Sequence, residues 1–126
     1  NTNTSEESEE SEEIATSNDY VSRLEFILNN HVYTDDLSLE YLAKELSLST
    51  KQVSRIIKKN YNANLADVVN EKKLSAACLM LKNTDYSIAE IIVKVNFKTE
   101  NYFYTLFKKR YNTTPLKYRK LHSEKQ

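Results

Sequence analysis

Residues 39–65, LEYLAKELSLSTKQVSRIIKKNYNANL, decide the fold, because their pattern returns in residues 88–115, IAEIIVKVNFKTENYFYTLFKKRYNTTP. Each copy spaces its apolar residues as a helix does, passes a Ser or Thr, and then repeats that spacing. Each copy closes on a Lys-Lys pair followed by one residue and then Tyr-Asn. The second copy has one extra residue between Phe97 and Thr99, within the expected turn. A pattern that occurs twice predicts two subdomains of the same design.

Within each copy, the pattern describes two helices joined by a tight turn. In the first copy, Ser49 is followed three residues later by Gln52, which is the spacing of a capping box at a helix start. In the second copy, Thr99 stands at the equivalent position. A short helix, a tight turn and a basic second helix form the helix-turn-helix unit, whose second helix fits the DNA major groove. Two such units predict a protein that holds two adjacent stretches of one duplex.

The composition favours helices and gives no sign of a membrane segment or a disulfide. The chain has one proline and no glycine, and 40% of its residues are hydrophobic, without the clean alternation of a strand. No apolar run approaches the roughly 20 residues that span a bilayer, and no signal peptide is visible. The single cysteine, Cys78, excludes an internal disulfide and fits a reducing compartment. We therefore expect a cytoplasmic, nucleoid-associated protein.

We expect an all-α fold of about seven helices, in which two helix-turn-helix subdomains are joined by a long linker helix. Ser38, Asn64, Ser87 and Thr114 stand where N-caps are expected, and Glu90 would complete a second capping box with Ser87. The expected helices span about residues 19–30, 39–46, 50–61, 65–82, a segment after Ser87, residues 100–111 and a segment that opens at Pro115.

The expected linker helix, residues 65–82, is apolar at both ends and polar at residues 70–73. Each end would pack into one subdomain, while the polar waist would cross solvent between them. The length of this helix, roughly 27 Å, is close to the roughly 34 Å that separates successive major grooves. This similarity favours two recognition helices that read successive grooves, and the alternative is an ordinary core helix, which has a similar length.

The charges are segregated, although the net charge is zero. Residues 1–13 carry six Glu and no basic residue, whereas residues 47–126 carry 16 basic and 6 acidic residues, a balance of +10. This asymmetry indicates a polyanionic partner, and a solvated lysine-rich surface is the alternative interpretation. We expect a disordered acidic linker or tail over residues 1–17, a folded domain over residues 18–122 and a disordered tail over residues 123–126. The acidic segment and the missing initial Met predict a fragment of a larger protein.

Six motifs occur in a fixed order: LAKELSLS at 42–49, KLSAA at 73–77, SIAEII at 87–92, NFKTENYF at 96–103, FKKRYNTTP at 107–115 and Tyr-Arg at 118–119. Together they resemble the DNA-binding domain of AraC/XylS-type transcription regulators. The resemblance covers roughly residues 20–120. It implies a bacterial transcription factor whose two recognition helices enter successive major grooves. It also implies a separate domain for sensing or dimerisation, which is absent from this chain.

Departures from the family pattern affect the turns and the expected contacts. The family usually has Gly at Asn96, and commonly at Asn62 and Asn112. Asn is the least costly non-glycine residue in left-handed backbone, so we predict a positive φ at Asn96 and Asn112, with Asn62 as a further candidate. The family often has Arg where Lys73 and Thr105 stand, which predicts weaker contacts in the linker helix and weaker base reading by the second subdomain.

The outward faces of the two basic helices supply the candidate base-reading residues. By motif alignment, Lys51, Ser54 and Arg55 fall where the family reads bases. Arg55 can donate two hydrogen bonds to guanine O6 and N7, with phosphate contact or solvent exposure as its alternative. Asn101 can pair with adenine, while Glu100 either accepts from cytosine N4 or only favours the helix N-terminus. The base-reading candidates are Thr50, Lys51, Ser54, Arg55, Glu100, Asn101, Tyr104 and Thr105.

Another group is predicted to contact phosphates, which position a protein without specifying sequence. Ser38 and Ser87 act first as caps, at helix starts whose N–H groups suit phosphate oxygens. With roughly six to eight basic residues on the DNA side, affinity should fall steeply as salt rises. The phosphate candidates are Ser38, Lys58, Lys59, Ser87, Thr99, Lys108 and Lys109.

The histidines, the lack of glycine and the tyrosines do not point to a metal site, to catalysis or to single-strand binding. His31 and His122 lack metal-ligand spacing, so we expect no metal site. No glycine-rich phosphate loop can form, and no pair of nucleophile and base is evident, so we expect no cofactor, no catalytic residue and no enzymatic activity. Nine tyrosines raise the possibility of stacking on single strands, but four of them fall at core positions. Those four are Tyr61, Tyr102, Tyr111 and Tyr118.

The leading hypothesis is sequence-specific binding to double-stranded DNA in transcription regulation. The expected partners are DNA, RNA polymerase and the missing N-terminal sensor or dimerisation domain. Two alternatives stay open at this point. One is a protein-interaction module built from the same helical lobes, and the other is an architectural binder of nucleic acid without sequence preference.

Overall fold

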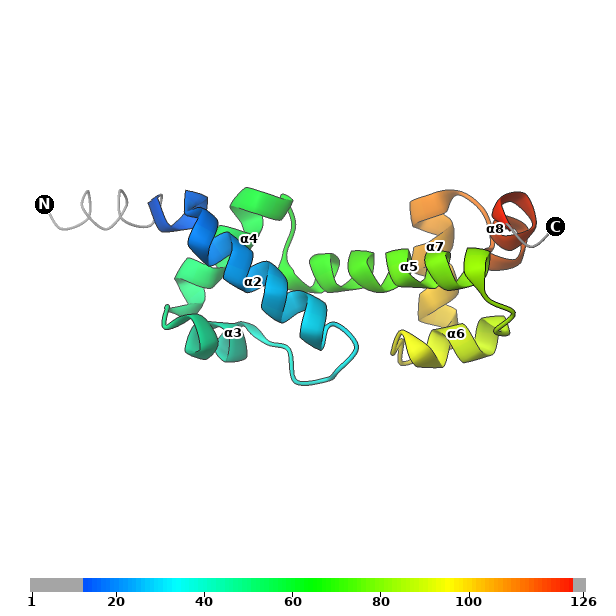
Figure 1. The fold of residues 1–126 in the computed structure, drawn as a ribbon, viewed down its shortest axis with the longest axis horizontal. Helices are drawn as coiled ribbons and strands as arrows, with labels where there is room; N and C mark the ends of the chain where they lie inside the picture. The colour runs from blue at the N-terminus through cyan, green and yellow to red at the C-terminus, as the bar shows by residue number, and fades with distance from the viewer. Residues whose placement is uncertain (1–12, 124–126) are drawn as a thin grey trace, which may run out of the picture. The chain divides into compact units, whose positions relative to one another are not determined.

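The computed structural model describes residues 13–123, and the acidic segment at residues 1–12 lies outside the described residues, as do residues 124–126. The expectation of disorder at the two ends therefore falls largely outside them as well. Seven helices follow a helical turn at residues 13–16, and no strand occurs between residues 13 and 123, which confirms the all-α expectation (Figure 1). The helices are α2 (Asn18–His31), α3 (Leu39–Leu46), α4 (Thr50–Tyr61), α5 (Leu65–Asn83), α6 (Ile88–Lys94), α7 (Glu100–Tyr111) and α8 (Pro115–His122).

Side-chain caps explain why the helix starts were predictable from the sequence. The Ser49 hydroxyl accepts from the Gln52 amide at 3.1 Å, and the Gln52 side chain accepts from the Ser49 amide at 2.9 Å, which completes the expected capping box. The second expected capping box is wrong. The Ser87 hydroxyl accepts from the Glu90 amide at 3.1 Å, but the Glu90 side chain returns no bond. An exposed carboxylate gains little there, because water already solvates it.

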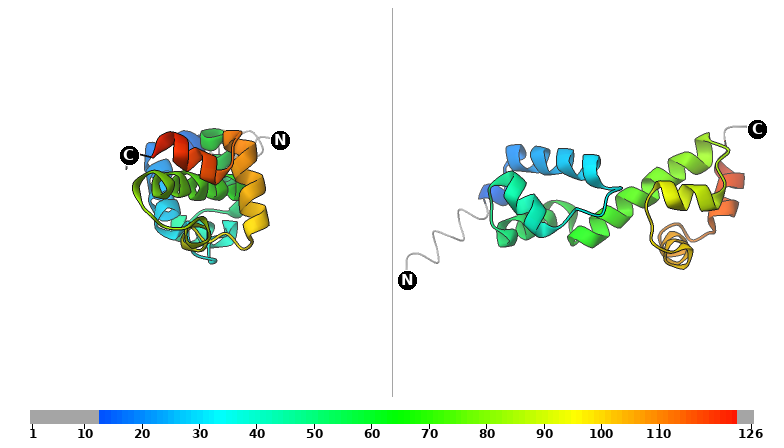
Figure 2. Two further views of the ribbon diagram at one scale, coloured as in Figure 1. Left: turned by 90° about the vertical axis from the view of Figure 1, so that its right-hand side faces the viewer. Right: turned by 90° about the horizontal axis from the view of Figure 1, so that it is seen from below.

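The first compact unit ends at Val69, and its core lies where α2, α3 and α4 meet (Figures 1 and 2). On α4, Val53, Ile56 and Ile57 are buried at the i, i+3 and i+4 positions of one helix face. The fully buried core residues of this unit are Ala15, Leu24, Leu28, Leu42, Leu46, Val53 and Ile56. Ile14 and Ala15 precede the domain boundary expected from the sequence, and both pack into this core.

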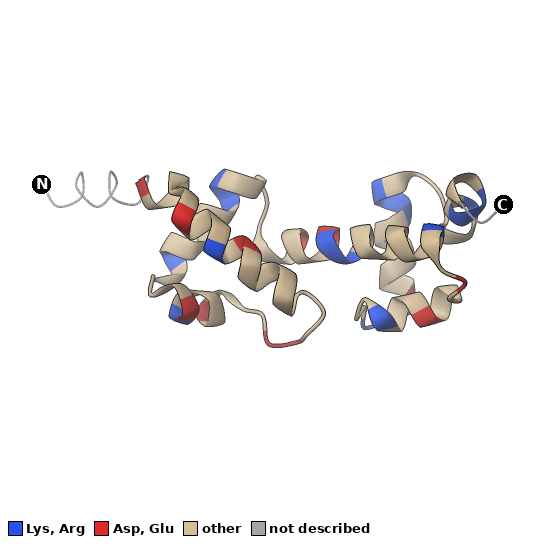
Figure 3. Ribbon diagram, in the orientation of Figure 1, with Lys and Arg blue, Asp and Glu red and all other residues tan. Residues whose placement is uncertain are grey.

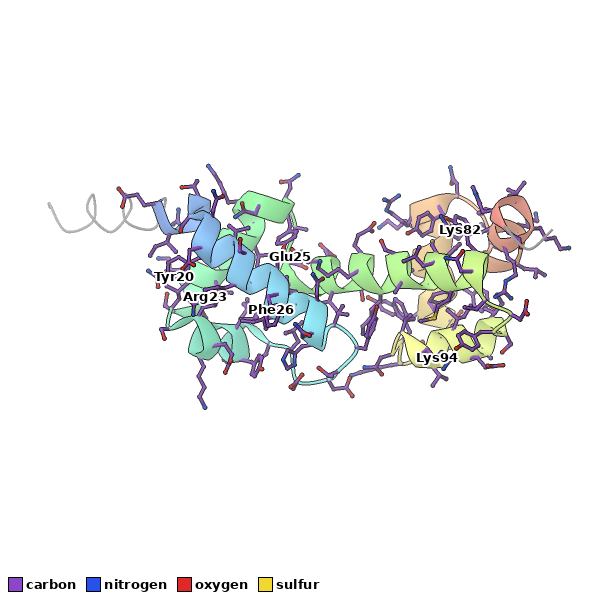
Figure 4. All side chains as sticks on the ribbon, in the orientation of Figure 1. Tyr20, Arg23, Glu25, Phe26, Lys82 and Lys94 are labelled. Carbon is purple, nitrogen blue, oxygen red and sulfur yellow. The ribbon has the colours of Figure 1, made fainter. Side chains whose placement is uncertain are left out.

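α2 is held to the C-terminal turn of α4 by a polar contact at the edge of this core. The Tyr61 hydroxyl donates to the Glu25 carboxylate, and burial, reinforced by that carboxylate, raises the pKa of Tyr61. Figure 4 labels Glu25 on α2, together with Tyr20, Arg23 and Phe26. Arg23 stacks over the Tyr20 ring at 5.6 Å, whereas Phe26 is 70% exposed.

The second unit begins at Asn70 and builds its core from α5, α6, α7 and α8. Phe103 and Phe107 are fully buried, and the Tyr118 ring meets the Phe107 ring edge-on at 5.6 Å. The expectation that Tyr102 is a core residue is wrong, because its side chain is 48% exposed. Tyr102 comes one position before the buried Phe103, so it lies off the buried face of α7, and its hydroxyl instead accepts from the Asn70 amide at 2.9 Å.

Left-handed residues end the helices that lead into turns. Asn62, Asn96 and Asn112 have φ values of 54°, 61° and 61°, so the positive φ predicted at these positions is confirmed. Ser47 also has a positive φ, at 57°, which the sequence did not indicate. Its amide closes the C-terminus of α3 onto Ala43 and Lys44, so the bonds of the helix end hold Ser47 in a conformation that serine seldom adopts.

The polar waist of α5 is not simply solvated, which corrects the expectation for residues 70–73. All four residues are half-buried. Three of them contact other parts of the second unit: Asn70 reaches Tyr102, Glu71 pairs with Arg110 at 2.9 Å, and the Lys73 ammonium donates to a backbone carbonyl. Long polar side chains can cover neighbouring backbone while keeping their charged ends hydrated, so a polar stretch of sequence can still make specific contacts.

The capping box at the start of α4 generates a stability prediction. Ser49→Ala should lower the free energy of unfolding by about 1 kcal/mol, because the amide of Gln52 loses its acceptor. Ser54→Ala is the matched control, since Ser54 is exposed within the same helix and Ala is at least as favourable there. Urea unfolding followed by circular dichroism compares the two variants. Equal stabilities would contradict the assigned role of the cap.

Candidate nucleic-acid interface

The outward face of α4 carries the candidates expected from the first copy of the repeat. Because Val53, Ile56 and Ile57 are buried on one side, the residues between them point to solvent. Thr50, Lys51, Ser54, Arg55, Lys58 and Lys59 are all exposed. An open hollow of this surface is lined by Lys51, Ser54, Arg55, Lys58 and Lys59. These residues are referred to below as the α4 basic face.

The α4 basic face combines hydrogen-bond donors with positive charge. Within residues 13–123, no carboxylate forms an ion pair with Lys51, Arg55 or Lys58. Figure 3 shows basic residues on α4 and also on α7. Arginine and lysine that are exposed without an acidic neighbour retain their full attraction for an anion, and an arginine can also hydrogen-bond a base edge with two donors.

The outward face of α7 is chemically different from that of α4. Glu100, Asn101, Tyr104 and Thr105 are exposed, so the structure places these candidates on one surface, as expected. The Tyr104 ring packs edge-on against Phe103 at 5.8 Å, which limits its freedom to reach outward. This face therefore offers an amide, two hydroxyls and a carboxylate, with lysines only in the last turn.

The three basic residues in the last turn of α7 do not have the same surroundings. Lys108 and Lys109 are exposed, as expected for phosphate contacts. The Arg110 guanidinium is held by the Glu71 carboxylate, with Nε at 2.9 and 3.0 Å from its two oxygens. This contact raises the pKa of Arg110 and ties α7 to α5, which gives Arg110 a structural partner.

The hydroxyl candidates for phosphate contact all serve as caps. Ser38, Ser87 and Thr99 accept from the amides of Tyr41, Glu90 and Tyr102 at 3.0–3.1 Å. A hydroxyl that accepts one hydrogen bond keeps its own O–H available as a donor. Capping and phosphate binding are therefore compatible at these positions, where Ser87 and Thr99 are exposed and Ser38 is half-buried.

Lys73 positions the turn before α7, a role that the sequence analysis missed. Its ammonium donates to the Asn96 carbonyl at 2.8 Å and lies 5.4 Å from the centre of the Phe97 ring. Asn96 has the left-handed conformation that starts the turn. The family's Arg at this position was a signal for such a contact, but the partner lies 23 residues away and could not be identified from the sequence.

Arg119 holds the loop between α5 and α6, and its role was also missed. Its guanidinium donates to the backbone carbonyls of Leu81, Thr84 and Tyr86 at 3.0, 3.2 and 2.7 Å. The first bond covers the C-terminal turn of α5, and the others fix the chain immediately before the Ser87 cap. The Tyr-Arg motif drew attention to this residue without indicating what it contacts.

The described part of the chain has neither a helix fit to cross a bilayer nor a cluster of metal-ligating side chains. None of its helices combines the length and apolar character that crossing a bilayer requires. Residues 13–123 also contain no group of three or more His, Cys, Asp or Glu side chains placed to hold a metal ion.

Comparisons with known proteins agree with this geometry. A family model described as a helix-turn-helix domain matches residues 42–121. The HTH-type transcriptional activator RhaR of Mannheimia succiniciproducens is 29% identical over 101 residues, which cover 79% of this chain and 37% of that protein. This chain spans between 28% and 37% of the first three curated relatives that it matches.

Two solved structures show the same fold. The C-terminal domain of the two-component response regulator yesN from Fusobacterium nucleatum has a TM-score of 0.71 and 32% identity, over 80% of this chain and 98% of that one. The C-terminal domain of AraT, a response regulator from Geobacillus stearothermophilus, has a TM-score of 0.74 and 29% identity, over 85% of this chain and 90% of that one.

The three carbonyls that Arg119 holds generate a second stability prediction. Arg119→Gln should destabilise the second unit by about 1–3 kcal/mol, because a shorter neutral side chain leaves the part-buried carbonyls of Leu81 and Thr84 without their donor. Amide hydrogen exchange should accelerate in residues 84–92, next to the loop that Arg119 holds. Lys120→Gln is the matched control at an exposed neighbouring position. The same exchange rates in both variants would overturn the assignment.

Proposed function

This chain belongs to the AraC-type helix-turn-helix family of DNA-binding transcription regulators, and from that premise we propose that it binds double-stranded DNA sequence-specifically through α4 and α7. Each of these helices is the second helix of a helix-turn-helix unit, which is the element that enters a major groove. In this proposal, α4 and α7 occupy successive major grooves of one duplex. The protein then regulates bacterial transcription at the sites that it recognises.

The observation that carries this proposal is the α4 basic face. Its residues are exposed on a rigid, capped helix, and the described residues give Lys51, Arg55 and Lys58 no acidic partner. A protein interface usually depletes lysine at its centre, whereas a DNA interface concentrates positive charge. The chemistry of this face therefore favours DNA over the alternative of a protein-interaction module.

The individual roles follow from position on α4. Arg55 and Lys51 lie in its first two turns and would read base edges, with Ser54 and Thr50 beside them. Lys58 and Lys59 lie in the last turn, where N–H groups of the ammonium can reach phosphates. Phosphate contacts fix the register of the helix, and base contacts carry the sequence preference.

α7 would be the weaker reader of the two helices. Asn101 can bind adenine N6 and N7, and Thr105 can contact a thymine methyl group. Glu100 can accept from cytosine N4, but its charge is repelled by nearby phosphates. Tyr104 lies beside them, while Lys108 and Lys109 would bind phosphates together with the exposed caps Ser87 and Thr99. On the α4 side, Ser38 would contribute in the same way.

The relatives are longer than this chain, so the proposal extends to parts of a regulator beyond it. We propose a sensing or dimerisation domain as the covalent partner and RNA polymerase as the transcriptional partner. A DNA-binding role would place the protein at the bacterial nucleoid in the cytoplasm. The proposal includes no enzymatic step and no cofactor, in keeping with relatives that are transcription regulators.

Titration of the 126-residue chain against the region upstream of its own gene and against random duplex tests the function. Specific binding predicts tighter binding to the upstream region, with affinity for both duplexes falling steeply as salt rises. Equal affinities would support the architectural alternative and contradict sequence-specific binding. No binding to either duplex, with the fold intact by circular dichroism, would leave the protein-interaction module as the better account.

Two substitutions on α4 separate base reading from phosphate binding. Arg55→Ala should cost about 1–3 kcal/mol at the preferred base and thereby relax the sequence preference. Lys58→Ala should weaken binding to every sequence by a similar factor and reduce the salt dependence by about one phosphate contact. Selection from a randomised duplex library, followed by titrations at several salt concentrations, measures both effects. An unchanged preference in Arg55→Ala would show that another residue reads the bases.

A further inference from the structure

We propose that the acidic run at residues 6–13 docks on the α4 basic face and competes there with DNA. The proposal rests on the proposed function, because it needs the α4 basic face to be a DNA surface. The acidic run is a segment of this chain with six Glu among eight residues. A carboxylate-rich segment offers lysine and arginine the same kind of charge-assisted hydrogen bonds that phosphates offer.

The acidic run is attached to the fold at a point that lies beside α4. Ala15 is fully buried in the first core. The Asn60 side-chain amide donates to the Ala15 carbonyl at 2.8 Å and also to the Ile56 carbonyl of its own helix at 2.8 Å. This contact, over 45 residues of sequence, fixes the chain at residue 15 against the last turn of α4. The same turn carries Lys58 and Lys59.

Charge makes the two surfaces complementary. The acidic run has six carboxylates and no basic residue. The α4 basic face has four cationic side chains, and the carboxylates of residues 13–123 form no ion pair with three of them, Lys51, Arg55 and Lys58. At low salt, charges that face each other within about 10 Å attract without full screening.

The run is long enough to reach along the whole α4 basic face. Glu6 stands nine positions before Ala15, which allows a span of up to about 30 Å in extended backbone. The twelve residues of α4 rise over about 18 Å. Tethering through a short segment gives an effective concentration on the order of millimolar, so weak ion pairs suffice for measurable occupancy. DNA must displace the run before its phosphates reach the same lysines.

A spin label attached at Glu9→Cys detects the contact directly in the 126-residue chain without DNA. The native Cys78 is buried, and Cys78→Ala removes it as a second labelling site. We expect broadening of the α4 amides that is strong at about 50 mM salt and largely lost at about 500 mM salt. The matched control carries the same label with Glu6, Glu7, Glu10, Glu12 and Glu13 changed to Gln. In this control we expect only the broadening that the tether itself causes, and we expect that broadening to be the same at both salt concentrations. Equal broadening in the labelled chain and its control would overturn the proposal.

Duplex titration measures the competition. The triple variant Glu9→Gln, Glu10→Gln and Glu12→Gln should bind duplex about three- to tenfold more tightly at about 50 mM salt and less than about twofold more tightly at about 300 mM salt. The control triple Glu40→Gln, Glu45→Gln and Glu90→Gln removes three exposed carboxylates from α3 and α6 and should gain less than about twofold.

The duplex titration and the spin-label experiment together distinguish a failure of the docking from a failure of the proposed function. An equal gain in both triples would overturn the competition, because net charge alone would then explain it. If no variant binds any duplex, the proposed function fails, while the spin-label experiment still decides whether the run contacts α4. If all variants bind the upstream region specifically but the label reports no salt-dependent contact, the function stands and the docking is wrong.

Discussion

The burial of three apolar side chains on one side of α4 is the constraint on which the rest depends. Val53, Ile56 and Ile57 are at most 1% exposed, so the helix cannot rotate about its axis without losing several kcal/mol of hydrophobic stabilisation. That fixed rotation keeps Arg55 and its neighbours in solvent. Phe103 and Phe107 impose the same condition on α7. The surface chemistry of both helices is therefore a consequence of what their opposite faces bury.

The helices also need fixed starting points, and local and long-range contacts supply these in different ways. Ser49 and Thr99 cap their helices through hydrogen bonds to residues three positions ahead. In the second unit, Lys73 adds a bond to the turn before α7, and Arg119 clamps the loop before α6 through three carbonyls. A recognition surface tolerates little displacement, so side chains that hold backbone from a distance help to keep the exposed faces of these helices in place.

The acidic and basic residues of the chain are concentrated in different segments. All 18 basic residues follow residue 13, while residues 1–13 carry six Glu, so a net charge of zero conceals two segments of opposite charge. In our proposals the α4 basic face binds DNA, and the acidic run competes with DNA for the same lysine and arginine side chains. The contrast between α4 and α7 follows from the same property, because Glu100 and Glu71 place carboxylates on or beside α7, where α4 has none on its basic face.

The sequence alone determined the helices, their caps, the left-handed asparagines and the family. These features depend on residues within four positions of one another or on a repeated pattern. Both kinds of relation can be recognised directly in a sequence. Only the tertiary structure decided the exposure of Tyr102, the left-handed Ser47, the contacts of residues 70–73 and the clamps of Lys73, Arg119 and Asn60. Apart from Ser47, whose conformation is imposed by the bonds at the end of α3, these features join residues 23 to 45 positions apart. A long side chain can bond to any carbonyl that packing brings near it. The partner of such a side chain is therefore decided only when the helices have packed.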